Sequence, residues 1–173
     1  STLPVLGGGG LALKNPTASR PMNWPQWILD ASTVNTEFSN PDYYAFLAPD
    51  DLWRRHVRSL VSRYRDRIDH WEVFNEPNLW LGSTPQKAAA RYLPYLKSAA
   101  AEIRALDADA KVVGYCINFG NNALDFAKAG YADGSANDGL SFADVVSFHP
   151  YGPQSLASTE PADAIIRQLK KLA

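Results

Sequence analysis

Residues 71–78 read Trp-Glu-Val-Phe-Asn-Glu-Pro-Asn, a short apolar run that ends in a cluster of polar residues. Its aromatic and β-branched residues are typical of a buried strand, which we expect over residues 71–75. A helix should follow, because Thr84 suits the N-cap and Pro85 suits the first helical position. The stretch therefore predicts a strand that leads into a helix ending near Leu106, the repeating unit of parallel sheets.

Similar strand-then-helix units flank this one. Further strands are expected over residues 2–6, 111–117 and 144–148, and further helices over residues 50–67, 123–132 and 161–172. Asp50 or Asp51 is expected to cap the first of these helices. Pro94 should kink or split the helix in which it lies. The stretch from residue 11 to residue 49 is rich in proline, asparagine, serine and aromatic residues, so we expect an irregular loop there.

The alternation of strands and helices predicts an α/β fold of parallel βα repeats, forming a single domain over residues 1–173. The valine pairs at residues 112–113 and 145–146 fit strands that are buried on both faces. Two architectures satisfy this pattern, an open doubly wound sheet and a part of a (β/α)8 TIM barrel. The hydrophobic pattern alone does not separate them.

Composition excludes several classes of protein. The 17 basic and 18 acidic residues give a net charge of −1, and no basic stripe is present that would bind nucleic acid. No apolar stretch is long enough to cross a membrane. The arginines within residues 54–67 are expected to form a solvated helix face. The sequence starts with Ser1 and not with methionine, so a secreted and a cytoplasmic location both stay open.

The sequence gives no sign of a cofactor. Cys116 is the single cysteine, which excludes an internal disulfide, and its apolar surroundings predict a small buried side chain. The histidines, His56, His70 and His149, lack the spacing of metal ligands. The four glycines at residues 7–10 do not lead directly into a helix, as a dinucleotide-binding loop would. We therefore expect no metal and no nucleotide, and a flexible loop at the glycines.

Polar residues follow the predicted strands at the ends where α/β proteins gather their functional groups. In both candidate architectures these are the C-terminal ends. The sequence places Asn75, Glu76, Asn118, His149 and Tyr151 there. A sheet that served only packing would not need such a set, so the pattern predicts a binding rim.

Glu76 is the candidate general acid in this set. At the end of a buried strand its carboxyl group should be partly desolvated, which favours the protonated form that an acid needs. Pro77 should hold Glu76 in extended geometry on the strand. Because side chains alternate along a strand, those of Asn75 and Glu76 leave the backbone in different directions. Both can still reach a pocket at the end of the strand. Glu72 lies four positions before Glu76, so on an extended strand both side chains point to the same face, and Glu72 is expected to be buried deeper.

His149 and Tyr151 are two positions apart, so their side chains should point to the same side if the chain stays extended. A histidine and a tyrosine that only pack in a core would give the same pattern. Their place at the end of a strand favours a role in the site.

Tryptophans could supply a platform for sugars. Trp24 and Trp27 lie in the long predicted loop, and Trp80 follows Glu76. Aromatic faces stack well on the apolar faces of sugar rings. The alternative is that these rings only pack the loop against the domain. We expect at least one of the three to line a sugar subsite.

Residues 71–78 resemble the fourth-strand signature of the large clan of retaining glycosidases built on (β/α)8 barrels, with the β-xylosidase-like glycoside hydrolase family 39 most similar. Residues 145–152, Val-Val-Ser-Phe-His-Pro-Tyr-Gly, resemble the sixth strand of that clan. Residues 3–6 and 111–117 would then be strands three and five. Substrates of the clan are β-linked oligosaccharides and polysaccharides, so the sugar and the linkage stay open.

The resemblance implies a role for each matching residue. Glu76 would be the acid/base and Asn75 would contact the sugar 2-hydroxyl. His149 and Tyr151 would line the site near the nucleophile. Asn118, at the end of the neighbouring strand, is a further candidate for substrate binding. No cofactor is implied.

One part of the family pattern is missing. The nucleophile of this clan is a glutamate at the end of strand seven, whereas the last glutamate here, Glu160, precedes a predicted helix. A full barrel takes about 250 residues. The sequence is therefore expected to be a central fragment, without strands one, two, seven and eight. Such a fragment would be inactive alone and would bind the missing barrel half or a second copy through its unpaired edges.

Two other classes remain as alternatives. A carbohydrate-binding barrel without turnover would keep the rim and would not need Glu76 to ionise. An unrelated α/β nucleotide-binding domain would have an open sheet with a topological switch point.

Overall fold

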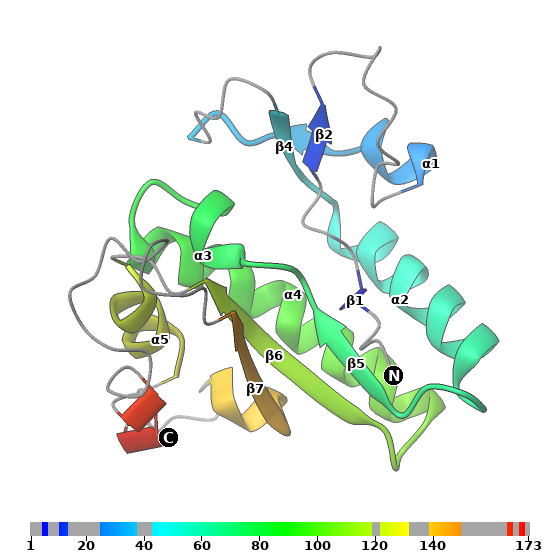
Figure 1. The fold of residues 1–173 in the computed structure, drawn as a ribbon. Coiled ribbons are helices and arrows are strands. Elements are labelled where there is room, and N and C mark those ends of the chain that lie inside the picture. Colours follow the sequence, from blue (N-terminus) through cyan, green and yellow to red (C-terminus); the bar gives the residue numbers. More distant parts are fainter. Residues whose placement is uncertain are drawn as a thin grey trace.

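The computed structural model describes residues 5–6, 11–13, 25–37, 43–118, 122–131, 139–149, 166–167 and 170–171. The predicted α/β class is confirmed, because helices pack on a parallel sheet (Figure 1). Its four strands are β1 (Val5–Leu6), β5 (His70–Val73), β6 (Lys111–Asn118) and β7 (Val145–His149). They lie in the order β1-β5-β6-β7, so their order in space follows their order in the sequence.

The register of the parallel strands brings the C-terminal ends of β5, β6 and β7 to one edge. Glu72 pairs with Val113, and Asn118 pairs with His149. The ladder between β6 and β7 is interrupted between Gly114 and Ile117, where an irregularity shifts the register. Such irregularities bend a strand and re-aim its side chains, which matters here because the candidate site lies directly beyond it.

Helices pack side by side on one face of the sheet. They are α2 (Asp50–Tyr64), α4 (Pro85–Leu106) and α5 (Ala123–Tyr131), and α4 contacts both of the others. The short α3 (Pro77–Trp80) and the 3-10 helix η1 (Gly139–Phe142) complete this layer. Within the described residues, no helix is long and apolar enough to cross a membrane.

An aromatic cluster fills the space between the sheet and the helices. Phe74 lies at its centre, with ring centroids of Trp53, Trp80 and Tyr95 at 5.0–5.4 Å. Phe74 and Trp53 are fully buried. Large rings of this kind dominate the energetics of a core.

The long irregular loop expected between residues 11 and 49 is wrong in part. The structure forms a second, antiparallel sheet there, in the order β2-β4-β3. Its strands are β2 (Leu11–Leu13), β3 (Thr33–Val34) and β4 (Tyr43–Leu47), with the short helix α1 (Gln26–Leu29) beside them (Figure 1). Strands this short give little periodic signal, and their pairing depends on partners distant in the sequence.

A set of polar contacts fastens this small sheet to α4. Arg91 donates to the carbonyl of Leu81 at 2.8 Å and to Oδ1 of Asn35 at 3.2 Å, and it pairs with Glu37 at 3.0 Å. Glu37 also accepts from the backbone and the hydroxyl of Ser83. These hydrogen bonds, with the Arg91 and Lys87 charges beside them, lower the pKa of Glu37 to about 2.

Several helix predictions hold and others are corrected. Thr84 caps α4 by accepting from the backbone of Lys87 at 3.3 Å, as predicted. Pro49, not Asp50 or Asp51, stands at the N-cap of α2, and the two aspartates lie in its first turn, where their charge favours the helix dipole. Pro94 does not split α4, which runs unbroken through it.

The predicted solvated arginine face is confirmed, because five of its six arginines are exposed and Arg54 is half-buried. Arg54 and Arg58 pair with Glu102 of α4 at 3.2 and 2.6 Å. Glu102 is buried, so its carboxylate needs these partners. Two of the arginines therefore join α2 to α4.

Candidate functional site

The candidate site is built around the carboxylate of Glu76. Its Oε1 accepts from Nδ2 of Asn118 at 2.8 Å and lies 2.8 Å from Nδ1 of His149. The three residues follow or end the neighbouring strands β5, β6 and β7. The side chain of Glu76 is 15% exposed and that of His149 is 33% exposed, so solvent or a ligand can reach the group. The sequence prediction that these three residues lie together is confirmed.

The backbone of Glu76 differs from the prediction. It was expected to be extended before Pro77, but its φ and ψ are both 50°, in the left-handed region. The residue is the N-cap of α3, so the chain turns sharply from β5 into that helix. A proline disfavours the right-handed α region at the preceding residue. The left-handed conformation satisfies both demands at a cost of about 1–3 kcal/mol.

Positive φ angles recur directly after β5 and at the irregularity within β6, next to the site. They occur at Phe74 (66°), Glu76 (50°), Tyr115 (74°) and Cys116 (31°). The backbone N–H of Glu76 donates to the carbonyl of Cys116 at 3.1 Å, which ties the two irregular stretches together. Strained backbone of this kind gathers at functional sites. It turns Phe74 into the core and leaves Glu76 at the rim.

Asn75 contributes both its backbone and its side chain. Its carbonyl accepts from the indole N–H of Trp80 at 2.9 Å, and its Oδ1 lies 3.8 Å from the sulfur of Cys116. The amide is therefore held beside Glu76, at the end of β5.

Cys116 lies between Asn75 and His149. Its sulfur is 3.4 Å from Nε2 of His149, so the imidazole bridges the thiol and Glu76. Burial raises the pKa of the thiol to about 12, and the Glu72 charge adds to this effect. The residue is fully buried, as its apolar surroundings predicted, but its contact with a site residue was not foreseen.

Glu72 and Ser147 form the inner end of this network. Glu72 is 5% exposed and accepts a hydrogen bond from the hydroxyl of Ser147. The two residues come from β5 and β7, so the contact crosses β6. Glu72 lies between the core residues Trp71 and Val73, and alternation therefore directs it to the other face of the sheet. The prediction that Glu72 is buried is confirmed, and Ser147 is its partner.

Asn78 supports the site from behind, and sequence reasoning missed it. Its amide exchanges two hydrogen bonds of 3.0 Å with the backbone of Asn118 and donates to the side chain of Asn122 at 3.0 Å. Asn122 returns a bond of 2.9 Å to the carbonyl of Asn78. Asn78 is 1% exposed. A polar residue two positions after Glu76 was the signal that could have identified it.

Of the two candidate tryptophans that the structure describes, Trp80 is placed where it could not serve as the predicted sugar platform. Trp80 is 3% exposed and its ring packs on Phe74, so it has no open face for a sugar. Trp27 is exposed, but the guanidinium of Arg55 on α2 lies 4.9 Å from its ring centroid, away from the Glu76 group. Trp24 and Tyr151 lie outside the described residues.

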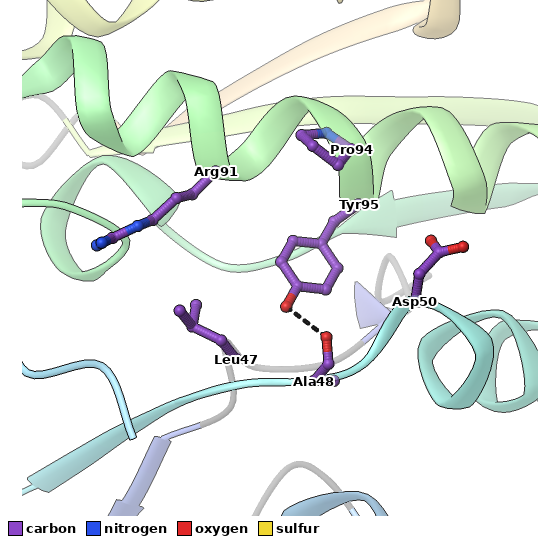
Figure 2. A pocket seen from close by; sticks show the side chains of 6 residues that line it. All are labelled: Leu47, Ala48, Asp50, Arg91, Pro94 and Tyr95. Carbon is purple, nitrogen blue, oxygen red and sulfur yellow. Dashed lines mark hydrogen bonds between the residues drawn. The ribbon is translucent and has the colours of Figure 1, made fainter. Parts of the chain in front are cut away.

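One pocket lies away from the Glu76 group. It has a volume of about 230 Å³ and is lined by Leu47, Ala48, Asp50, Arg91, Pro94 and Tyr95 (Figure 2). Tyr95 donates to the carbonyl of Ala48 at 2.8 Å, as the dashed line in Figure 2 shows. Its charged residues already have partners, Arg54 for Asp50 and Glu37 for Arg91. The Glu76 group offers the more complete chemistry.

Among the described residues, no group of three histidine, cysteine, aspartate or glutamate side chains is arranged to hold a metal ion. Comparison of the sequence with models of protein families gives no match, and comparison with curated proteins gives none either. The arrangement of Glu76, Asn118, His149 and Cys116 is therefore interpreted from its geometry.

Proposed function

We propose that the protein is a glycoside hydrolase that acts on β-linked oligosaccharides or polysaccharides, with Glu76 as its general acid/base. The observation that carries this proposal is the asymmetric environment of the Glu76 carboxylate. Oε1 meets both Asn118 and His149, whereas no described residue forms a hydrogen bond with Oε2. One oxygen is thus fixed and the other is available for a transferable proton.

The chemistry follows from that asymmetry. Protonated Glu76 donates its Oε2 proton to the glycosidic oxygen as the bond from that oxygen to the anomeric carbon breaks and a carboxylate nucleophile forms a bond to the same carbon. In the second step the ionised carboxylate takes a proton from the attacking water, which restores the acid. Asn118 and His149 hold the carboxylate in one orientation throughout, and such positioning is a large part of enzymatic rate enhancement.

The proposal includes a barrel segment, with β1, β5, β6 and β7 as strands three to six of a (β/α)8 barrel. Sequential strand order supports this architecture, since a doubly wound sheet reverses its order at a switch point. Helices that pack side by side, α2 on α4 and α4 on α5, also fit the outer layer of a barrel. Among the described residues, β1 and β7 are the edge strands of the sheet, and each pairs with one neighbouring strand. Closing strands, from the same protein or a second copy, would pair with these edges.

A retaining reaction needs a second carboxylate, about 5–5.5 Å from the first. Glu72 is an unsuitable nucleophile because it is buried and accepts from Ser147. The nucleophile would therefore come from a part of the protein that the structure does not describe. Asn75 would contact the sugar 2-hydroxyl beside the reacting bond, and Tyr151 would lie near the nucleophile.

The test compares two substrates in the protein that carries this chain. Glu76→Gln should lower kcat on an unactivated β-glycoside by about 10²–10⁴-fold, the usual contribution of a general acid. Bond cleavage in a glycoside with a strongly acidic phenol as leaving group should slow far less, since that group departs without protonation. Asp125→Asn is the matched control, because Asp125 lies on the exposed surface of α5.

Product stereochemistry supplies an independent check. A retained anomeric configuration, followed by NMR at early times, is the expected result. An equal loss of kcat/KM on both substrates would contradict the acid role of Glu76, because kcat/KM reports on the step in which the leaving group departs. Binding of a β-linked oligosaccharide without any turnover would instead favour a carbohydrate-binding module.

A further inference from the structure

The thiol of Cys116 occupies a position from which it can set the protonation of a site residue. Its sulfur lies 3.4 Å from Nε2 of His149 and 3.8 Å from Oδ1 of Asn75. The other nitrogen of the imidazole, Nδ1, lies 2.8 Å from Oε1 of Glu76. A neutral imidazole carries one N–H and one lone pair, so its two contacts are complementary.

The thiol is a donor in this arrangement. Burial raises its pKa to about 12, so near neutral pH it keeps its proton. That single proton can point to Asn75, to His149 or to Glu72. The contact with His149 is shorter than that with Asn75 by 0.4 Å (3.8 against 3.4 Å). A thiol that donates to Nε2 requires a lone pair there, which leaves the imidazole proton on Nδ1.

The contacts of Glu76 agree with this tautomer. An N–H at Nδ1 donates to Oε1, which also accepts from Nδ2 of Asn118. The opposite tautomer would direct the lone pair of Nδ1 at a carboxylate oxygen, which is favourable only if that oxygen holds the proton of Glu76. In the Nδ1–H form the thiol donates to Nε2, while the imidazole N–H and the Asn118 amide both donate to Oε1. Oε2 is left for the proton that is transferred.

We infer that Cys116 is a positioning residue. Its thiol donates to Nε2 of His149 and keeps the imidazole in the neutral Nδ1–H form that donates to Glu76. The functional meaning of this contact rests on the proposed function, in which Glu76 must alternate between acid and base. An N–H at Nδ1 that donates to Oε1 fixes the orientation of the carboxylate and leaves Oε2 for proton transfer.

A rival interpretation uses the same three residues. Sulfur, imidazole and carboxylate occur in the order of a nucleophilic cysteine with its base and orienting acid. A nucleophilic thiol must be accessible and must ionise readily. Cys116 is fully buried and its raised pKa keeps it protonated, so the positioning role fits and the nucleophilic role does not.

The tautomer can be measured directly by 15N NMR of the imidazole nitrogens at neutral pH. The protein has three histidines, and loss of one set of signals in His149→Asn identifies His149. In the wild type we expect a pyridine-like signal for Nε2 and a pyrrole-like signal for Nδ1. Cys116→Ser should retain this pattern, because a hydroxyl can also donate. Cys116→Ala should shift the Nε2 signal towards the protonated, pyrrole-like position.

Two results would overturn the inference. One is a pyrrole-like signal for Nε2 in the wild type. This measurement does not depend on the folding of any variant. The other is an unchanged Nε2 signal in folded Cys116→Ala. The result is separable from the proposed function, since the tautomer is read without any substrate. If the protein shows the expected NMR pattern but hydrolyses no glycoside, the result supports the role of Cys116 and counts only against the proposed function.

Alkylation separates the two roles of the thiol. Cys116 is the single cysteine, so incorporation of iodoacetamide reports on it alone. We expect the native thiol to react on the order of 100-fold or more slowly than the urea-unfolded chain, because modification requires opening of the core. Rapid alkylation of the native protein near neutral pH would overturn the positioning role in favour of a nucleophile.

Discussion

The backbone N–H of Tyr115 donates to the phenolic oxygen of Tyr92 at 2.7 Å, inside the core. The same hydroxyl donates to the carbonyl of Val73 at 3.1 Å. Tyr115 has a positive φ and Val73 ends β5, so both groups lie where the strand ladders become irregular. One side chain of α4 therefore satisfies β5 and β6 directly behind the site.

Tyr92→Phe should destabilise the protein by about 2–4 kcal/mol, because it leaves a buried carbonyl and a buried N–H without their partner. Urea unfolding followed by circular dichroism measures the change. Tyr64→Phe is the matched control, since the hydroxyl of Tyr64 makes no hydrogen bond among the described residues, and it should change stability by less than about 0.5 kcal/mol. Equal stability of the two variants would contradict this account of Tyr92.

Ser147→Ala tests the inner end of the polar network. The substitution removes the hydroxyl that donates to buried Glu72, so we expect a loss of about 1–3 kcal/mol. The double variant with Glu72→Gln should lose less than the sum of the single variants, because the two side chains share one interaction. Ser62→Ala, on the exposed face of α2, is the control in the same urea titration. Additive losses would contradict direct coupling.

Glu37 should make the attachment of the small sheet sensitive to acid. Its pKa is lowered from 4.5 to about 2, so the ionised form is favoured in the folded protein. The resulting stability is fully present above pH 4.5 and is lost as the pH falls towards 2. The difference in Tm between wild type and Glu37→Gln should therefore be constant above this window and disappear through it. Asp125→Asn, away from this contact, should not reproduce that pattern.

His56 should make the stability of the protein depend on pH in a second range, higher than that of Glu37. Burial lowers its pKa from 6.5, and its Nε2 has no hydrogen-bond partner in the described residues. A lowered pKa means that stability is present above pH 6.5 and falls below it, as the imidazole must be protonated without a partner. His56→Leu should flatten the dependence of Tm on pH just below 6.5. Ser62→Ala, on the exposed face of α2, removes no titratable group and should leave this dependence unchanged.

The sequence predicted β5, β6 and β7 well because each is a compact apolar run followed by polar residues. It also predicted the start of α4, because a threonine before a proline satisfies two local demands of a helix N-terminus. These signals are local, and no partner elsewhere in the chain competes with them. The same local signals predicted Glu76, Asn118 and His149 at one rim of the sheet.

Features that depend on distant partners were missed. The left-handed backbone of Glu76 belongs to a turn that Trp80 and Asn78 hold through contacts with Asn75 and Asn118. The antiparallel sheet consists of short strands whose pairing has no periodic signature. Trp80 was expected at an open face because sequence does not reveal on which side of α3 it lies.

Asn78 uses its amide N–H groups, its amide oxygen and its backbone carbonyl in hydrogen bonds, all inside the protein. An aspartate of the same shape would lose both side-chain donors and would direct a negative charge at the backbone carbonyl of Asn118. A leucine would fill the space but make none of the three side-chain bonds. Position 78 should therefore be as intolerant in a library of random substitutions as position 76, although it would never touch a substrate. Intolerance to substitution at position 78 would then reflect the need for one correctly oriented amide and not a direct role in catalysis.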